Sequence, residues 1–156
     1  MTPTRRFILA AIVSAPIAAV ATTVSVSPAM AEKPAIFAPG GKAIRGYDPV
    51  AYFTQKKPVK GDPRYTYKWK GATWYFSSAA NLRKFKSNPN RWAPQYGGYC
   101  AYGIAQGYVV KIEVDQWAVV NGKLYLNYSR AVQSRWKKDV PGYIKTANKK
   151  WPSILK

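Results

Sequence analysis

The sequence predicts a single α+β domain, in which β-hairpins form a small antiparallel sheet packed against several short helices. Helical and strand patterns alternate along the chain, and an Asn121-Gly122 pair separates two apolar runs, which is typical of a tight hairpin. The chain has 156 residues, of which 47% are hydrophobic, and this suffices for one sizeable core. The single cysteine, Cys100, permits no intramolecular disulfide, so packing must stabilise the fold.

The first predicted elements are a short helix and a hairpin. Asp48 can cap the helix and Pro49 suits its first turn, so we predict helix as far as about Gln55. Over residues 65–76, β-branched and aromatic residues alternate with lysines, and Gly71 interrupts the pattern. This segment is predicted to be a β-hairpin that turns near Gly71.

The later elements follow from capping residues, apolar spacing and turn residues. Ser77 or Ser78 can cap a helix over residues 79–87, which the Asn88-Pro89 pair ends. The stretch around Cys100 is rich in glycine, proline and tyrosine and predicts an irregular turn. Beyond it we predict a strand over 108–114, the Asn-Gly hairpin over 117–126, and helices over 129–138 and 141–150.

The N-terminus has the pattern of an export signal. Arg5 and Arg6 precede a mostly apolar run, and Ala29-Met30-Ala31 is typical of a signal-peptidase site. We therefore predict a signal peptide over residues 1–31, a flexible leader over 32–42 and the folded domain over 43–156, in a periplasmic or secreted protein. Both general secretion and twin-arginine export fit the arginine pair.

The amino acids that are missing exclude several kinds of site. The chain has no histidine, and both methionines, Met1 and Met30, lie in the predicted signal peptide. This rules out Ser-His-Asp and Cys-His catalytic pairs, His-ligated zinc, and His or Met ligation of haem. Cys100 is then the only soft ligand, and we expect no enzyme in its own right and assign no catalytic residue.

The charge indicates an anionic partner. Without Arg5 and Arg6, 23 basic residues face 6 acidic ones, a net charge of +17. Such a surface attracts anionic lipid headgroups or acidic polymers of the cell envelope. Nucleic acid is not expected, because an exported protein has little access to it. High charge also serves solubility alone, so it names no partner.

Several blocks of sequence resemble the exported YHS-domain proteins, a group that includes selenoproteins. They are residues 46–53, 67–85, 88–101 and 122–129, in an order that spans most of the chain after residue 42. The motif residues within them are Tyr47, Asp48, Pro49, Tyr96, Gly97, Gly98, Tyr99, Asn127, Tyr128 and Ser129. The resemblance implies that Cys100 occupies a position held by cysteine or selenocysteine, which points to redox or metal chemistry.

The resemblance also implies heavy-metal handling, through cysteines near the Asp-Pro-Val segment and after the Tyr-Phe strand. Here the sequence departs from the pattern, because Ala51 stands in the first region and Ser77 and Asn81 in the second. Only Cys100 can therefore be carried over as a metal ligand.

Three roles remain open for Cys100, and the leading hypothesis is an exported accessory protein that acts through metal binding or thiol redox chemistry. It could bind copper or another soft metal ion, with Asp48 as a weak second ligand or with the Cys100 of a second protomer in a homodimer. It could be a redox thiol, made reactive by nearby Lys and Arg, that forms a disulfide with a redox or metal partner protein or with a small thiol. It could also be a small buried hydrophobic residue in a basic envelope-binding module.

Overall fold

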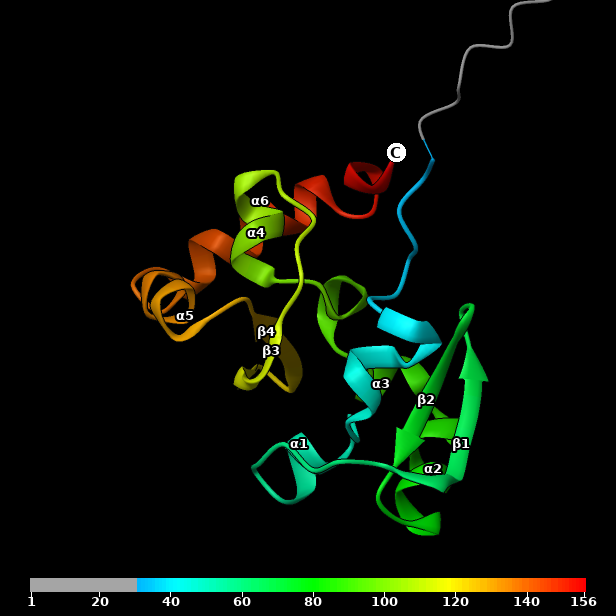
Figure 1. Ribbon diagram of the computed structural model, residues 1–156. Coiled ribbons are helices and arrows are strands. Elements are labelled where there is room, and N and C mark those ends of the chain that lie inside the picture. Colours follow the sequence, from blue (N-terminus) through cyan, green and yellow to red (C-terminus); the bar gives the residue numbers. More distant parts are fainter. Residues whose placement is uncertain (1–30) are drawn as a thin grey trace, which may run out of the picture.

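The structure, a computed structural model, describes residues 31–156, so the predicted signal peptide lies almost wholly outside the described residues. Two hairpins and a set of short helices form two lobes that lie side by side (Figure 1). The strands are β1 (Asp62–Trp69), β2 (Ala72–Phe76), β3 (Glu113–Val120) and β4 (Lys123–Asn127). The α-helices are α1 (Ala51–Thr54), α2 (Ala79–Ser87), α3 (Pro89–Trp92), α4 (Ala101–Gln106), α5 (Arg130–Trp136) and α6 (Val140–Lys150).

This arrangement confirms the predicted α+β class. β1 pairs with β2 and β3 with β4, both antiparallel, so the hairpins form two separate two-stranded sheets instead of the one small sheet expected. The second hairpin turns at Asn121 and Gly122, whose φ angles are 50° and 71°. Two successive positive φ angles are what a type I′ turn requires, and this is why the Asn-Gly pair located the hairpin.

The larger core cluster includes the aromatic side chains of the first lobe and extends into the second hairpin, where it includes Leu124 and Leu126. Trp74, Phe76 and Phe85 have no exposed surface, and the Trp74 and Phe85 ring centroids lie 4.9 Å apart. This places α2 against β1 and β2 (Figure 1). Ser78, one of the two serines predicted as the cap, begins α2 by accepting a hydrogen bond from the backbone N–H of Asn81 at 3.1 Å.

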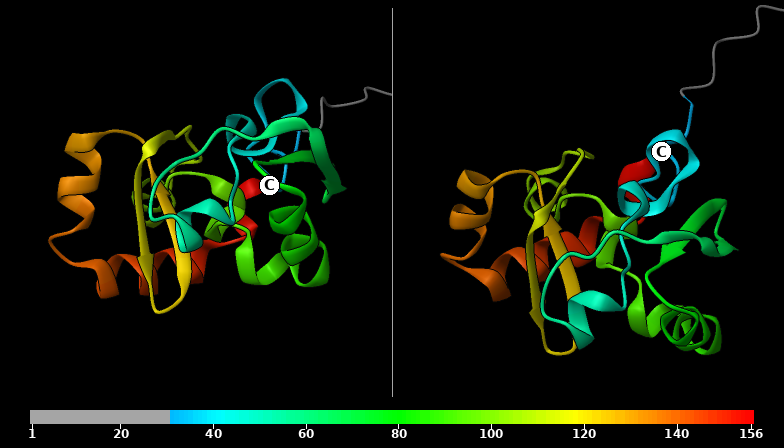
Figure 2. Two further views of the ribbon diagram at one scale, coloured as in Figure 1. Left: turned by 90° about the horizontal axis from the view of Figure 1, so that it is seen from below. Right: turned by 60° about the horizontal axis from the view of Figure 1, so that its bottom comes forward.

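The second lobe packs helices against the other hairpin. Both views in Figure 2 place α5 on the far side of β3 and β4 from the first hairpin, whereas α6 runs from there past the two strands toward the C-terminus. Trp136 of α5 is buried beside Tyr125 of β4, with their ring centroids 5.6 Å apart. Among residues 31–156, no helix is long and apolar enough to cross a membrane.

The segment from residue 32 to 42, predicted to be a flexible leader, is extended over its first part but lies against the folded body. The backbone N–H of Lys33 donates to the carbonyl of Leu155 at 2.8 Å. Ile36 is only 5% exposed and belongs to the larger core cluster. Burial of this apolar side chain explains why the segment is packed despite its proline and glycine content.

Three details differ from the sequence prediction. Residues 108–112 are not a strand, and β3 begins only at Glu113. The reason is that the backbone N–H of Tyr108 donates to the carbonyl of Gly103, at 2.8 Å, and so completes the C-terminal end of α4. The first residue of the predicted strand therefore belongs to the end of a helix. The short helices α3 and α4 were not predicted, since neither has a long amphipathic pattern.

Candidate functional site

Cys100 lies at the start of α4, in the turn that the sequence singled out. Its Sγ accepts a hydrogen bond from the backbone N–H of Gly103 at 3.3 Å, so the side chain caps the helix. Its own N–H donates to the carbonyl of Val110 at 3.2 Å. The turn that leads to it contains Gly97 and Gly98 at φ 61° and 84°, a left-handed conformation that glycine adopts without strain.

The thiol is buried and neutral. Cys100 has no exposed surface, and Sγ lies 3.7 Å from Oδ1 of Asn127, which accepts the S–H. Burial raises the pKa of the Cys100 thiol, while the backbone N–H groups of Gly103, Tyr128 and Tyr102 oppose the rise. The expectation that nearby Lys and Arg lower this pKa is wrong, because burial is the largest cause of the shift. A disulfide between two Cys100 residues would require the site to open first.

Asn127 is the polar neighbour of the thiol. Its Oδ1 also accepts the N–H of Tyr102, at 3.3 Å, and the residue has no exposed surface. Its Nδ2 has no hydrogen-bond partner among the described residues. A buried amide nitrogen without a partner is costly, so Nδ2 is an unsatisfied donor within the core.

A pocket of about 380 Å³ lies next to Cys100. Tyr108 and Tyr128, which are 65% and 40% exposed, are the large hydrophobic side chains most open to solvent among residues 31–156, and both line it. The other lining residues are Cys100, Tyr102, Gly103, Gln106, Val110 and Val132. The wall is mainly apolar and aromatic, and the cysteine provides its only soft donor atom.

Asp48, the second ligand expected for a metal, serves a structural network instead. It is fully buried, and its Oδ2 accepts the N–H and the hydroxyl of Ser77 at 2.8 and 2.7 Å and Nδ2 of Asn81 at 2.7 Å. Its Oδ1 accepts the N–H of Val50 and of Ala51, at 2.8 and 3.3 Å. All of its acceptor sites are therefore used at the junction of α1, β2 and α2.

This network unites the positions at which the sequence departs from the metal-binding pattern. Ser77 and Asn81, which stand where cysteines were expected, contact Asp48 directly. Asp48 and Cys100 share neither a hydrogen bond nor a pocket. Among the described residues, no group of three or more His, Cys, Asp or Glu side chains could hold a metal ion.

The remaining motif residues have structural contacts. The hydroxyl of Tyr96 donates to Oδ1 of Asn148 at 2.9 Å, and the hydroxyl of Tyr99 donates to the carbonyl of Pro34 at 2.9 Å. Ser129 caps α5. Tyr47 forms an isolated antiparallel β-bridge with Lys60, and Pro49 lies in the turn that leads into α1. Burial raises the pKa of both Tyr96 and Tyr99, so each hydroxyl stays protonated at neutral pH.

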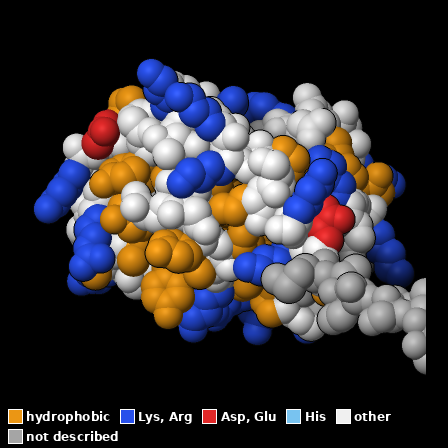
Figure 3. Space-filling view, turned by 90° about the horizontal axis from the view of Figure 1, so that it is seen from above, with side chains coloured by type: hydrophobic (Ala, Val, Ile, Leu, Met, Phe, Trp, Pro, Cys, Tyr) orange, Lys and Arg blue, Asp and Glu red, His pale blue; other side chains and the backbone are white. Residues whose placement is uncertain are grey.

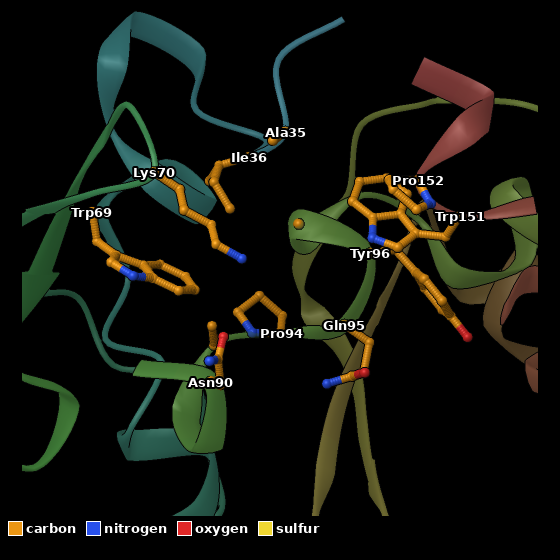
Figure 4. A pocket seen from close by; sticks show the side chains of 12 residues that line it. Ala35, Ile36, Trp69, Lys70, Asn90, Pro94, Gln95, Tyr96, Trp151 and Pro152 are labelled. Carbon is orange, nitrogen blue, oxygen red and sulfur yellow. The ribbon is translucent and has the colours of Figure 1, made fainter. Parts of the chain in front are cut away.

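A second hollow, of about 360 Å³, was not predicted from the sequence. We call it the tryptophan cleft, and its lining comes from four distant segments, one of which holds Ala35 and Ile36 (Figure 4). Trp69 and Lys70 form one side, Trp151 and Pro152 the opposite side, and Asn90, Pro94 and Gln95 lie between them. Their separation in the sequence explains why no local pattern indicated the cleft.

The comparison with protein families bears on the first lobe. Residues 50–96 match the YHS domain. The match supports a YHS domain protein over this segment, which we call the YHS segment and which contains α1, the first hairpin, α2 and α3. It covers 47 of the 156 residues and ends before Cys100, so the resemblance beyond residue 96 is not tested by it. No curated protein and no solved structure matches the chain.

Proposed function

We propose that the protein is a non-catalytic YHS-type module that binds anionic material of the cell envelope through its basic surface, and that Cys100 is a structural residue. The observation that carries this proposal is the scarcity of carboxylates able to neutralise the cations. From residue 32 onward, 23 basic residues face 6 acidic ones. Export by the predicted signal peptide forms part of the proposal.

The structure reduces the available negative charge further. Asp48 is buried in its hydrogen-bond network and does not face solvent. Within residues 31–156 there are two ion pairs, Arg64 with Asp62 at 2.6 Å and Arg45 with Glu113 at 3.6 Å. On the face shown in Figure 3, Lys and Arg side chains project around much of the outline, whereas Asp and Glu occupy small areas. Most cations are thus free to meet an anionic partner.

The buried thiol supports the same conclusion. Cys100 is packed, caps α4 and has a raised pKa, which are properties of a structural cysteine. A site for a soft metal ion would need further soft ligands, and the pocket beside Cys100 is lined by no other sulfur or imidazole.

The test is binding of the chain from Glu32 onward to phosphatidylglycerol vesicles and, separately, to polygalacturonate, at NaCl concentrations from low to high. We expect binding to at least one of them that weakens steeply with salt and that persists in Cys100→Ser, because exposed charges are screened beyond a Debye length. Matched phosphatidylcholine vesicles and a neutral polysaccharide should bind weakly. Absence of binding at low salt, or its loss in Cys100→Ser, would contradict the proposal.

Thiol chemistry at Cys100 is the second candidate, and the pocket beside it is the observation that favours it. Three backbone N–H groups oppose the rise in the thiol pKa, so they stabilise a thiolate once it forms, and the Nδ2 group of Asn127 has no partner. The thiolate would attack a small disulfide, form a mixed disulfide and release the other half as a thiolate.

Two measurements separate this candidate from a structural role. One is the rate at which Cys100 reacts with a small aromatic disulfide in the folded protein, compared with the same chain in urea. The other is competition for Cu(I) against a chromophoric chelator, beside Cys100→Ser. Fast reaction in the folded state would establish a redox thiol, and stoichiometric Cu(I) binding lost in the variant would establish a thiolate metal site. Slow reaction and no competition would leave the structural role.

A further inference from the structure

We propose that the tryptophan cleft binds a carboxylated sugar ring, such as one unit of an acidic polysaccharide. This inference deepens the proposed function and rests on it for the nature of the polymer. Whereas the proposed function assigns binding to the basic surface as a whole, this inference names one discrete site. The site is formed by Trp69 and Lys70 of the first hairpin, Asn90 and Gln95 in and after α3, and Trp151 after α6. The cleft is separate from the pocket that contains Cys100.

The size of the cleft suits one ring. Its volume of about 360 Å³ is near the lower end of the range of roughly 300–1,000 Å³ for small-molecule sites. Trp69 and Trp151 are both half-buried and lie on opposite sides, with open space between them (Figure 4). The negative face of an indole attracts the weakly positive C–H groups of a pyranose ring, so such walls suit a sugar.

The cation is positioned for an anion. Lys70 Nζ lies 4.5 Å from the centroid of the Trp69 ring, and Figure 4 shows it pointing into the open space. Lys70 has no carboxylate partner among the described residues, and no Asp or Glu lines the cleft. A single ammonium group that has no carboxylate partner is suited to one carboxylate of a ligand, to which it would donate a charge-assisted hydrogen bond.

Two amide side chains favour a ligand with hydroxyl groups. Asn90 and Gln95 line the cleft, and neither side chain makes a hydrogen bond to another residue of the described chain. Each amide offers both donors and an acceptor, which match the paired donor and acceptor character of sugar hydroxyls. A purely apolar ligand, such as an acyl chain, would leave these groups unpaired.

The experiment is calorimetric titration of the chain from Glu32, which contains every described helix and strand, with a trimer of galacturonic acid in 150 mM NaCl. The neutral galactose trimer is the control ligand. Lys70→Gln tests the cation, and Lys68→Gln is the matched control, because Lys68 is also exposed on the first hairpin but does not line the cleft. Circular dichroism of both variants verifies that they fold.

We expect the acidic trimer to bind at least about tenfold more tightly than the neutral one, and Lys70→Gln to weaken it about tenfold. Lys68→Gln should change the affinity less than about twofold, because Lys68 does not line the cleft and makes no direct hydrogen bond to the bound ring. Asn90→Ala and Gln95→Ala should each weaken binding with little change in stability, because neither side chain has a partner within the described chain.

Several results would overturn the inference: equal effects of the two lysine variants, equal binding of the two trimers, or no binding of the acidic trimer. Lipid vesicles that lose affinity in Lys70→Gln, while the trimer does not bind, would assign the cleft to a lipid headgroup instead. If vesicles or polymer bind with steep salt dependence but Lys70→Gln and Lys68→Gln are alike, the proposed function stands and the cleft inference fails. If the trimer binds through Lys70 while binding to vesicles and polymer shows no steep salt dependence, the proposed function fails alone.

Discussion

Replacing Asp48 with alanine should remove about 4 kcal/mol from the free energy of unfolding. The carboxylate accepts five hydrogen bonds, three of which lie in fully buried surroundings, from Val50 N–H, Ala51 N–H and Asn81 Nδ2. A buried donor left without its partner costs roughly 1–3 kcal/mol. Three such donors would together cost roughly 3–9 kcal/mol. Partial relaxation of the structure and hydration of the Ser77 groups reduce this cost to about 4 kcal/mol, which is a large share of the roughly 5–15 kcal/mol that is typical for the free energy of unfolding of a domain.

Urea denaturation measures this loss directly. With a slope of about 2 kcal/mol per molar, the midpoint should fall by about 2 M. Asp139→Ala is the matched control, because Asp139 makes a single exposed capping bond to Gly142 N–H at 3.0 Å, and the loss of a cap costs about 1 kcal/mol. Equal losses in the two variants would refute the structural role of Asp48. Unchanged stability together with weaker Cu(I) binding would make Asp48 a metal ligand after all.

Two further predictions concern Cys100 and Gly97. Alkylation of Cys100 by iodoacetamide should be much slower in the folded protein than in urea at pH 7. The free energy of unfolding should fall as the pH rises through and above 9.0, because the pKa of the Cys100 thiol is raised in the folded state and the thiol of the unfolded chain ionises first. Cys100→Ser should reduce this fall. By thermal denaturation, Gly97→Ala should lower the free energy of unfolding by about 2 kcal/mol more than Gly122→Ala. Both glycines have positive φ, but a Cβ at Gly97 would collide with the carbonyl oxygen of Ala35, whereas Gly122 faces open space. Equal losses would show that the segment before residue 42 moves away from the added methyl group at little cost.

The parts of the fold that follow local rules could be predicted from the sequence. The Asn121-Gly122 turn and the helix that Ser78 caps both follow from residues within four positions of one another. The strand expected over residues 108–114 begins only at Glu113, because an apolar run does not reveal which backbone groups already have hydrogen-bond partners. In this run the N–H of Tyr108 is bonded to the end of α4, and the carbonyl of Val110 is bonded to the N–H of Cys100.

The candidate sites were harder to predict because they depend on distant contacts. Asp48 was recognised as a helix cap, but its bonds to Ser77 and Asn81 span 29 and 33 positions, so the network could not be read locally. Cys100 is not among the usual capping residues, and its burial depends on packing. The tryptophan cleft brings Trp69 and Trp151 together across 82 positions, and no local pattern signals such a meeting.

The limits of the YHS segment are not those of a folding unit. Trp74, Phe76 and Phe85 lie within it, but the cluster that they form also includes Ile44 from before the segment and Leu124 from after it. A polypeptide cut at residues 50 and 96 would lose these partners and leave part of its core cluster open to water. Any transplant of the YHS segment into another protein would therefore have to carry the second hairpin with it, or provide a substitute cover of similar shape.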